Sequence, residues 1–253
     1  MKPRIIYEDE HIIVAYKPSG LATQTAKVGQ PDMESELKKE LMLRGRAQGN
    51  VASGGSSQGR PYLGIIHRLD QPVEGLLVFA KNAKAAAQLS KQLTGGSLNK
   101  QYFAVICGQP LQKKAELVDY LLKGKDNRAQ VVTGQEREYA DAKKAVLQYK
   151  VLESVSTPMA LSLVDIHIDT GRFHQIRVQM AHAGMPLLGD VKYGSERECQ
   201  AGRDLGIRSV ALCAYKLVFQ HPVTGKKMSF EVKPENKAFD FFLENNFGCD
   251  CLY

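Results

Sequence analysis

Long apolar segments and an N-terminal targeting signal are both absent from this sequence. No apolar stretch approaches the roughly 20 residues that a membrane-spanning helix needs. Residues 1–4 lead directly into a strand-like segment at 5–7, without the apolar core of a signal peptide or the composition of a transit peptide. We therefore expect a cytoplasmic protein with no membrane partner.

Cysteine is scarce, and its distribution favours neither a disulfide framework nor a metal site. The five cysteines are odd in number and scattered, which is typical of reduced thiols in a cytosol. Cys249 and Cys251 form a C-x-C pair, but no second pair lies at the spacing of zinc ligands. The sequence also lacks a phosphate-binding glycine loop and a recognisable Ser-His-Asp order. We expect neither a metal nor a cofactor.

The net charge and the length of the chain indicate its type of partner and its number of domains. The net charge of +7 favours polyanionic partners, with nucleic acid first, although charge alone leaves open a mildly basic enzyme without such a partner. With 253 residues, 43% of them hydrophobic, the chain is ordinary globular material. We expect a monomer with one catalytic domain over residues 1–253. Glycine and serine dominate residues 45–60, which predicts a flexible loop there.

The order of elements predicts an α+β fold with a mixed, largely antiparallel central sheet and flanking helices. There is no alternation of strands and helices of the kind that builds a doubly wound parallel sheet. Asp32 is the expected N-cap of the first helix, and Gly95 and Gly96 end the second. The expected elements are a β-hairpin over 4–16, helices over 32–44 and 83–93, a strand over 100–108 and a run of strands over 115–169.

The central stretch, residues 63–81, places a carboxylate between two apolar segments. Residues 63–66 and 75–80 are expected strands, and Pro72 takes the chain out of strand pairing between them. Asp70 is therefore expected at a strand end. Taken alone, an aspartate before a proline is more often a turn residue than a catalytic one.

A second notable stretch is an expected helix from Thr170, its predicted N-cap, to about residue 183. His174 and Arg177 are three residues apart and share one face of this helix. A cation in the first turns of a helix opposes the helix dipole, so Arg177 needs a carboxylate or phosphate nearby. A packed terminal helix is expected from residue 237 onwards.

Several motifs, in order, resemble those of the RluA-type pseudouridine synthases, over roughly residues 5–235. T-G-R-x-H-Q-I-R at 170–177 is the most specific of them. One position departs from the family pattern: two small hydroxylated residues usually precede the glycine that follows H-R-L-D, whereas this chain has Val73-Glu74 before Gly75. Only 16 residues precede Lys17, so no S4 domain is expected. The other matching motifs are K-P-x-G-L at 17–21, H-R-L-D at 67–70 followed by 75–81, K-x-Y-x-A-x-x-G at 100–108, G-M-P at 184–186, G-D-x-x-Y-G at 189–194 and the closing strand and turn at 212–225.

The resemblance implies a sheet in two halves with a central active cleft, and it implies roles for individual residues. Asp70 would be the nucleophile, Tyr102 would lie against the target base, and Arg177 would approach Asp70 within salt-bridge reach, about 4 Å. Without the resemblance, Tyr102 would be read as an ordinary strand residue. The expected substrate-binding residues are Arg68, His67, Arg172, His174 and Leu212, the last of which could equally be a core leucine.

These side chains suit the isomerisation of uridine to pseudouridine in ribosomal or transfer RNA, because that reaction needs no electrons, hydrolytic water or cofactor. Asp70 could attack C1′ or remove a proton from C2′, and the sequence leaves both routes open. The alternatives are an inactive RNA-binding module and a glycosidic-bond hydrolase. A hydrolase usually needs two carboxylates, and Glu74 is the nearest second candidate.

Overall fold

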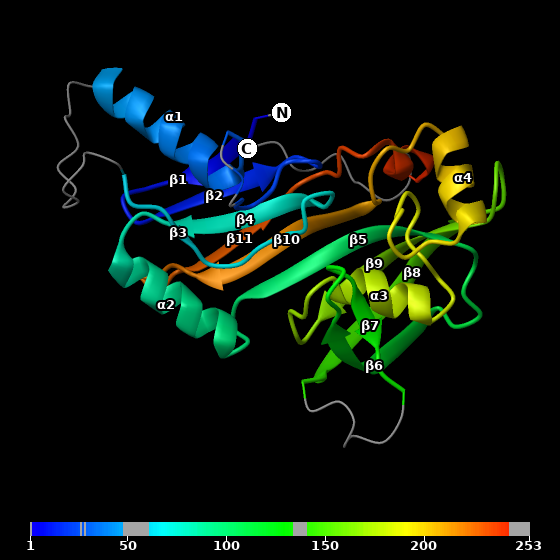
Figure 1. Cartoon of the computed structure of the whole chain (residues 1–253). Coiled ribbons are helices and arrows are strands. Elements are labelled where there is room, and N and C mark those ends of the chain that lie inside the picture. The colour runs from blue at the N-terminus through cyan, green and yellow to red at the C-terminus, as the bar shows by residue number, and fades with distance from the viewer. Residues whose placement is uncertain (1, 26, 28, 48–60, 134–140, 243–253) are drawn as a thin grey trace. The chain divides into compact units, whose positions relative to one another are not determined.

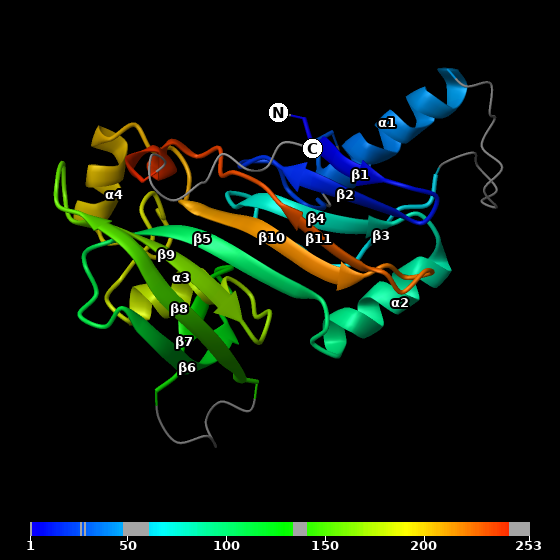
Figure 2. The same ribbon diagram turned by 180° about the vertical axis from the view of Figure 1, so that it is seen from behind.

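The computed structural model describes residues 2–25, 27, 29–47, 61–133 and 141–242, and Figures 1 and 2 show it from two opposite sides. The chain divides into two compact units. Unit 1 comprises Met1–Asn99 and Lys216–Val232, and unit 2 comprises Lys100–Tyr215 and Lys233–Tyr253. Within the described ranges, no helix has the length and apolar character needed to cross a membrane.

Unit 1 is built on a hairpin and the strand that follows the central loop. β1 (Arg4–Glu8) and β2 (Ile12–Lys17) form the predicted antiparallel hairpin, and β2 pairs antiparallel with β4 (Glu74–Ala80). Every residue of β2 and β4 is buried. β3 (Gly64–Ile65) is shorter than the strand predicted over 63–66.

The two helices of unit 1 begin where the sequence predicts. α1 (Met33–Ala47) is capped by Asp32, whose Oδ1 accepts the backbone N–H of Ser35 at 2.7 Å. α1 runs to Ala47, so the first residues of the predicted loop at 45–60 are helical, and residues 48–60 lie outside the described ranges. α2 (Ala83–Thr94) ends at Gly95, as predicted.

The core of unit 1 joins segments that are far apart in the sequence. β10 (Leu212–Gln220) crosses the boundary between the units, and its second half pairs antiparallel with β11 (Lys227–Glu231). Leu217 and Phe219 of β10 pack in one buried cluster with side chains of β2, β4 and α2, including Ile12, Val14, Leu76, Val78, Ala85 and Leu89.

Unit 2 contains the predicted run of strands. The strands pair antiparallel in the order β5-β9-β8-β6-β7, and α3 (Gln175–His182) packs against β6, β7 and β8. Together with the helices this confirms the α+β class. The bounds of these strands are Asn99–Cys107 for β5, Lys114–Lys123 for β6, Ala129–Val131 for β7, Lys143–Val155 for β8 and Leu161–Ile168 for β9.

Three helical predictions in unit 2 were wrong or incomplete. Thr170 is not the N-cap of α3, because its hydroxyl donates to Gln175 Oε1 at 2.7 Å; the helix starts after His174, which has φ +53° and no side-chain capping bond. α4 (Glu196–Asp204) was not predicted. The predicted terminal helix is a short 3-10 segment, η2 (Lys237–Phe241), and residues 243–253 lie outside the described ranges.

Candidate active site

Asp70 lies in the loop that connects β3 to β4, just before β4 begins. Its backbone carbonyl accepts the N–H of Val73 at 3.0 Å, which closes a turn around Pro72. The Asp70 side chain is half-buried, whereas the side chains on either side of the turn, Leu69 and Val73, are buried. The predicted position directly at a strand end is wrong, because β3 already ends at Ile65 and β4 begins only at Glu74, so Asp70 lies within the loop between them.

The segment after β2 holds this loop by hydrogen bonds to its backbone. Thr23 Oγ1 donates to the carbonyl of Leu69 at 3.0 Å and accepts its N–H at 3.2 Å. Ser19 Oγ donates to the carbonyl of Pro72 at 2.8 Å, and the Gly20 N–H donates to that of Gln71 at 2.9 Å. The backbone on both sides of Asp70 is therefore fixed from one neighbouring segment.

Lys17, the last residue of β2, is the buried centre of this arrangement, with 0% of its surface exposed. Its Nζ donates to the backbone carbonyls of Leu21 at 2.6 Å, Gln71 at 3.0 Å and Pro18 at 3.1 Å. Burial lowers the pKa of Lys17 to about 7, although the negative charges of Asp70 and Glu74 act to raise it. Lys17 thus brings an amine that titrates near pH 7 into the neighbourhood of the candidate nucleophile.

The lowered pKa of Lys17 predicts a pH dependence of stability. Between about pH 7 and its unfolded value of 10.5, the unfolded chain binds more protons than the folded chain. The free energy of unfolding should therefore rise with pH in this window, by up to about 1.4 kcal/mol per pH unit, and the gain is lost as pH falls through about 7. Urea unfolding of wild type and Lys17→Met at several pH values measures this contribution. An unchanged pH slope in the variant would show that Lys17 does not titrate in this range.

His67 and Arg68 belong to the same loop as Asp70 but differ in environment. His67 is buried, and its Nε2 accepts the backbone N–H of Val78 at 3.4 Å, so its ring packs against β4. Arg68 is exposed. Of these two predicted substrate-binding residues, Arg68 therefore has the more accessible side chain.

Tyr102 and Leu212 lie in strands of unit 2. Tyr102 is on β5 opposite Ile166 of β9 and is 5% exposed, so the expected strand placement is confirmed and its ring is mostly covered. Leu212 begins β10 and is also buried. Their predicted contacts with a base remain predictions.

Arg177, in the first turn of α3, has the neighbouring carboxylate that its position requires. Its Nε donates to Asp190 Oδ2 and its Nη2 donates to Asp190 Oδ1, each at 2.7 Å. The two side chains are 5% and 1% exposed. This is the forked geometry that arginine forms with a carboxylate, in a buried setting where it strongly fixes orientation.

The same network continues to Tyr193 and His174. Asp190 Oδ1 accepts the backbone N–H of Lys192 at 2.9 Å, and the Arg177 guanidinium lies 5.2 Å from the centroid of the Tyr193 ring. The Tyr193 hydroxyl makes a 2.7 Å hydrogen bond with His174 Nδ1 and accepts the N–H of Ala129 at 2.8 Å. His174 and Arg177, which were predicted to share a face of the helix, both form hydrogen bonds with side chains of the segment 190–193.

Arg172 lies outside α3, in the turn that leads into it. Its side chain is exposed, and its Nε donates to the backbone carbonyl of Lys144 at 3.0 Å. Gln175 organises the turn, because its Oε1 accepts the N–H of Arg172 at 3.0 Å and its Nε2 donates to the carbonyl of Val146 at 2.9 Å. Arg172 is thus presented at the surface next to β8.

The predicted residues fall into two groups, one in each unit. His67, Arg68 and Asp70 share one loop of unit 1, whereas Tyr102, Arg172, His174, Arg177 and Leu212 belong to unit 2. The expected pair of Asp70 and Arg177 remains a prediction. Sequence reasoning gave no role to Lys17, Asp190 or Tyr193, although all three stand in motifs that resemble the family: K-P-x-G-L and G-D-x-x-Y-G.

Comparisons with known proteins identify the family. Residues 11–182 match the family model described as RNA pseudouridylate synthase. A ribosomal large subunit pseudouridine synthase D from Zymomonas mobilis is 33% identical over 233 residues, which are 90% of this chain and 68% of that protein. The protein of the same name from Pseudomonas aeruginosa is 35% identical over 237 residues, 90% of this chain and 67% of that one. Some relatives are matched over as little as 57% of their length.

Solved structures support the same fold. The human protein RNA Pseudouridylate Synthase Domain Containing 4 aligns over 92% of this chain and 89% of its own, with a TM-score of 0.68 and 23% identity. Human RNA Pseudouridylate Synthase Domain Containing 1 aligns over 92% and 84%, with a TM-score of 0.69 and 20% identity. The chain belongs to the RNA pseudouridylate synthase family, whose members are isomerases that act on RNA.

Proposed function

We propose that this chain isomerises uridine to pseudouridine in large-subunit ribosomal RNA, with Asp70 as the nucleophile. The match of residues 11–182 to the family model carries the proposal, because this region contains H-R-L-D at 67–70. The names of the bacterial relatives support ribosomal RNA as the substrate class. Transfer RNA is the second candidate substrate.

The loop geometry supports the role of Asp70. During the reaction the N1–C1′ bond of uridine breaks, the uracil turns while it is held, and C5 bonds to C1′. A carboxylate that attacks C1′, or one that takes the C2′ proton, must be aimed while the base moves. The hydrogen bonds from Lys17, Thr23 and Ser19 to the loop backbone limit the motion of the segment that carries Asp70.

Other residues take the roles that the motifs imply. Tyr102 stacks on the uracil and relays its C5 proton, and Arg177 orients the nucleophile. Arg68 and Arg172, which are both exposed, contact phosphates. The less exposed side chains His67, His174 and Leu212 also bind the substrate nucleotide.

The isomerisation is tested by tritium release from RNA labelled at C5 of uridine, followed by nucleoside analysis. Pseudouridine in the product supports the proposal. Free uracil would indicate a hydrolase, and binding without either product would indicate an RNA-binding module. Mapping of pseudouridine in cellular RNA with and without the gene then separates ribosomal from transfer RNA as the substrate.

We also propose that the two units act together as one catalytic domain in a cytoplasmic monomer without a metal ion. The expected result is full turnover of pre-folded RNA in excess EDTA, because no step assigned above uses a Lewis acid. Activity that is lost in EDTA and restored by zinc or magnesium would contradict the proposal. Pre-folding of the RNA is the control, since RNA structure itself depends on divalent cations.

A further inference from the structure

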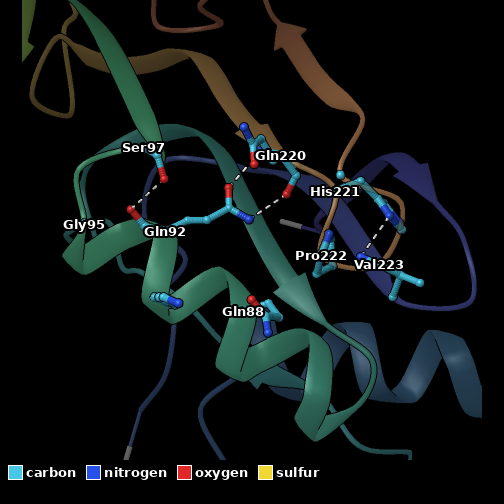
Figure 3. Close-up of a pocket in the computed structure, with 10 residues that line it drawn as sticks. Gln88, Gln92, Gly95, Ser97, Gln220, His221, Pro222 and Val223 are labelled. Atoms are coloured by element: carbon cyan, nitrogen blue, oxygen red, sulfur yellow. Dashed lines mark hydrogen bonds between the residues drawn. The ribbon is translucent and has the colours of Figure 1, made fainter.

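A polar groove lies in unit 1 between the C-terminal half of α2 and the turn that joins β10 to β11. Its volume is about 450 Å³. Figure 3 shows Gln88 and Gln92 on the side of the helix that faces the turn residues Pro222 and Val223. The complete lining is Gln88, Lys91, Gln92, Gly95, Ser97, Gln220, His221, Pro222, Val223 and Gly225.

Hydrogen bonds fix both walls of the groove. The Gln92 side chain donates from Nε2 to the carbonyl of Gln220 at 2.7 Å and accepts the N–H of Gln220 at 2.8 Å (Figure 3). His221 Nδ1 accepts the N–H of Thr224 at 3.0 Å, and its Nε2 bonds to Asp9 Oδ2 at 2.9 Å. The helix and the turn are therefore held at a set separation before any ligand binds.

The two segments that form the groove carry an excess of positive charge, although Asp9 contacts the lining residue His221 from the β1–β2 turn. Residues 82–99 and 217–230 contain no aspartate or glutamate, and they contain four exposed lysines, Lys84, Lys91, Lys226 and Lys227. On α1, by contrast, Lys38 is paired with Glu34 at 2.6 Å. A surface with an excess of lysines over carboxylates attracts polyanions.

The side chains in the groove suit a sugar-phosphate backbone. The amides of Gln88 and Gln220 and the hydroxyl of Ser97 offer donors and acceptors, and Lys91 adds a positive charge. Glutamine, serine and lysine side chains commonly contact phosphates and sugars in nucleic-acid complexes. Only Pro222 and Val223 are apolar in the lining, which does not suit a hydrophobic protein partner.

The groove is at the opposite end of β4 from Asp70. Asp70 precedes the first residue of β4. The last residue of β4, Ala80, pairs with Ile12 of β2. The N–H of Ile12 donates to the Asp9 carboxylate, which also bonds to His221 in the groove. Seven residues of strand span roughly 20 Å at about 3.3 Å per residue. A ligand that reaches both places must extend over this distance.

We propose that this groove binds the backbone phosphates of the substrate RNA, about 20 Å or more from the target uridine. The inference rests on the proposed function and adds to it a second contact surface outside the catalytic loop. The enzyme then selects RNA in which a folded segment lies at this distance from the modified uridine.

The test compares two double variants that remove equal charge from unit 1. Lys91→Gln with Lys227→Gln changes one lysine that lines the groove and one beside it at the start of β11, and Lys38→Gln with Lys39→Gln changes α1, where acidic residues adjoin the lysines. Binding of an unmodified large-subunit ribosomal RNA transcript is measured across a series of potassium chloride concentrations. The groove variant should bind about tenfold more weakly, with a salt slope smaller by about two units, and its KM should rise in proportion. The α1 variant should match wild type.

Equal affinities and equal salt slopes in the groove variant and wild type would overturn the inference. Equal losses in both double variants would also overturn it, because they would show a general charge effect. These outcomes are distinct from failure of the proposed function, which would appear as wild-type enzyme that makes no pseudouridine. A Gln88→Ala variant with weaker RNA binding but an unchanged salt slope would further support hydrogen bonding in the groove.

Discussion

Asp70→Asn should reduce pseudouridine formation by at least about a thousandfold, because asparagine has nearly the same shape but is not a nucleophile. RNA affinity should change little, since affinity comes mainly from phosphate contacts. The loop should also remain folded, because Asn keeps the backbone carbonyls of Leu69, Gln71 and Pro72, which accept hydrogen bonds from Thr23, Lys17 and Ser19. Single-turnover tritium release and filter binding measure the two effects separately.

The matched control is Asp126→Asn, which removes an exposed carboxylate whose nearest ion-pair distance, to Arg128, is 3.9 Å. This change should leave turnover unaltered, because exposed pairs of this kind contribute little. If Asp70→Asn also turned over near the wild-type rate, Asp70 would have no catalytic role and the proposed site would have to be sought elsewhere.

Changes to the Arg177–Asp190 pair should have the second-largest effect, on both activity and stability. Arg177→Lys replaces a fork that donates to both carboxylate oxygens by a single ammonium group. We expect turnover to fall by about a hundredfold, because a displacement near 1 Å has this cost at a reacting centre. RNA affinity at low salt should be retained, since the positive charge remains.

Asp190→Asn should lower the free energy of unfolding by about 3–5 kcal/mol, the usual cost of breaking a buried ion pair from one side. The amide also presents a donor to the guanidinium where an acceptor stood. Urea unfolding measures this loss, and Asp126→Asn is again the control. An Asp190→Asn protein with wild-type stability would show that the buried pair does not contribute to the fold.

The sequence predicted the elements whose signals are local. The hairpin at 4–16 and the cap of α1 at Asp32 have apolar alternation or a capping side chain, and both were correct. α3 was predicted four residues too long at its start, because the Thr170 hydroxyl bonds to a glutamine side chain that folds back from the helix. α4 was missed, although Ser195 and Glu198 form a capping box that the sequence displays.

The sequence motifs predicted which residues belong to the candidate site, but not which residues those side chains contact. Lys17 was visible as a charged residue at a strand end, but nothing local indicates that its Nζ is buried and also donates to the carbonyl of Gln71, 54 residues away in sequence. Asp190 is 13 residues after Arg177, on a segment that only the turn after α3 brings back. Such pairs form only when the chain packs into its tertiary structure. Neither the periodicity of apolar residues nor the spacing of motifs in a single sequence reveals them.

The chain order of unit 1 has a consequence for synthesis on the ribosome. Leu217 and Phe219 complete the cluster formed by β2, β4 and α2, but residues 100–215 must be translated first. At about 5–20 residues per second, this delay is on the order of 10 s. During that time the nascent hairpin and β4 lack the β10 side chains that complete their apolar cluster, so we expect the emerging N-terminal segment to bind chaperones. The groove beside α2 likewise cannot form until the β10–β11 turn has been synthesised, so the RNA contact proposed for this surface requires a completed unit 1.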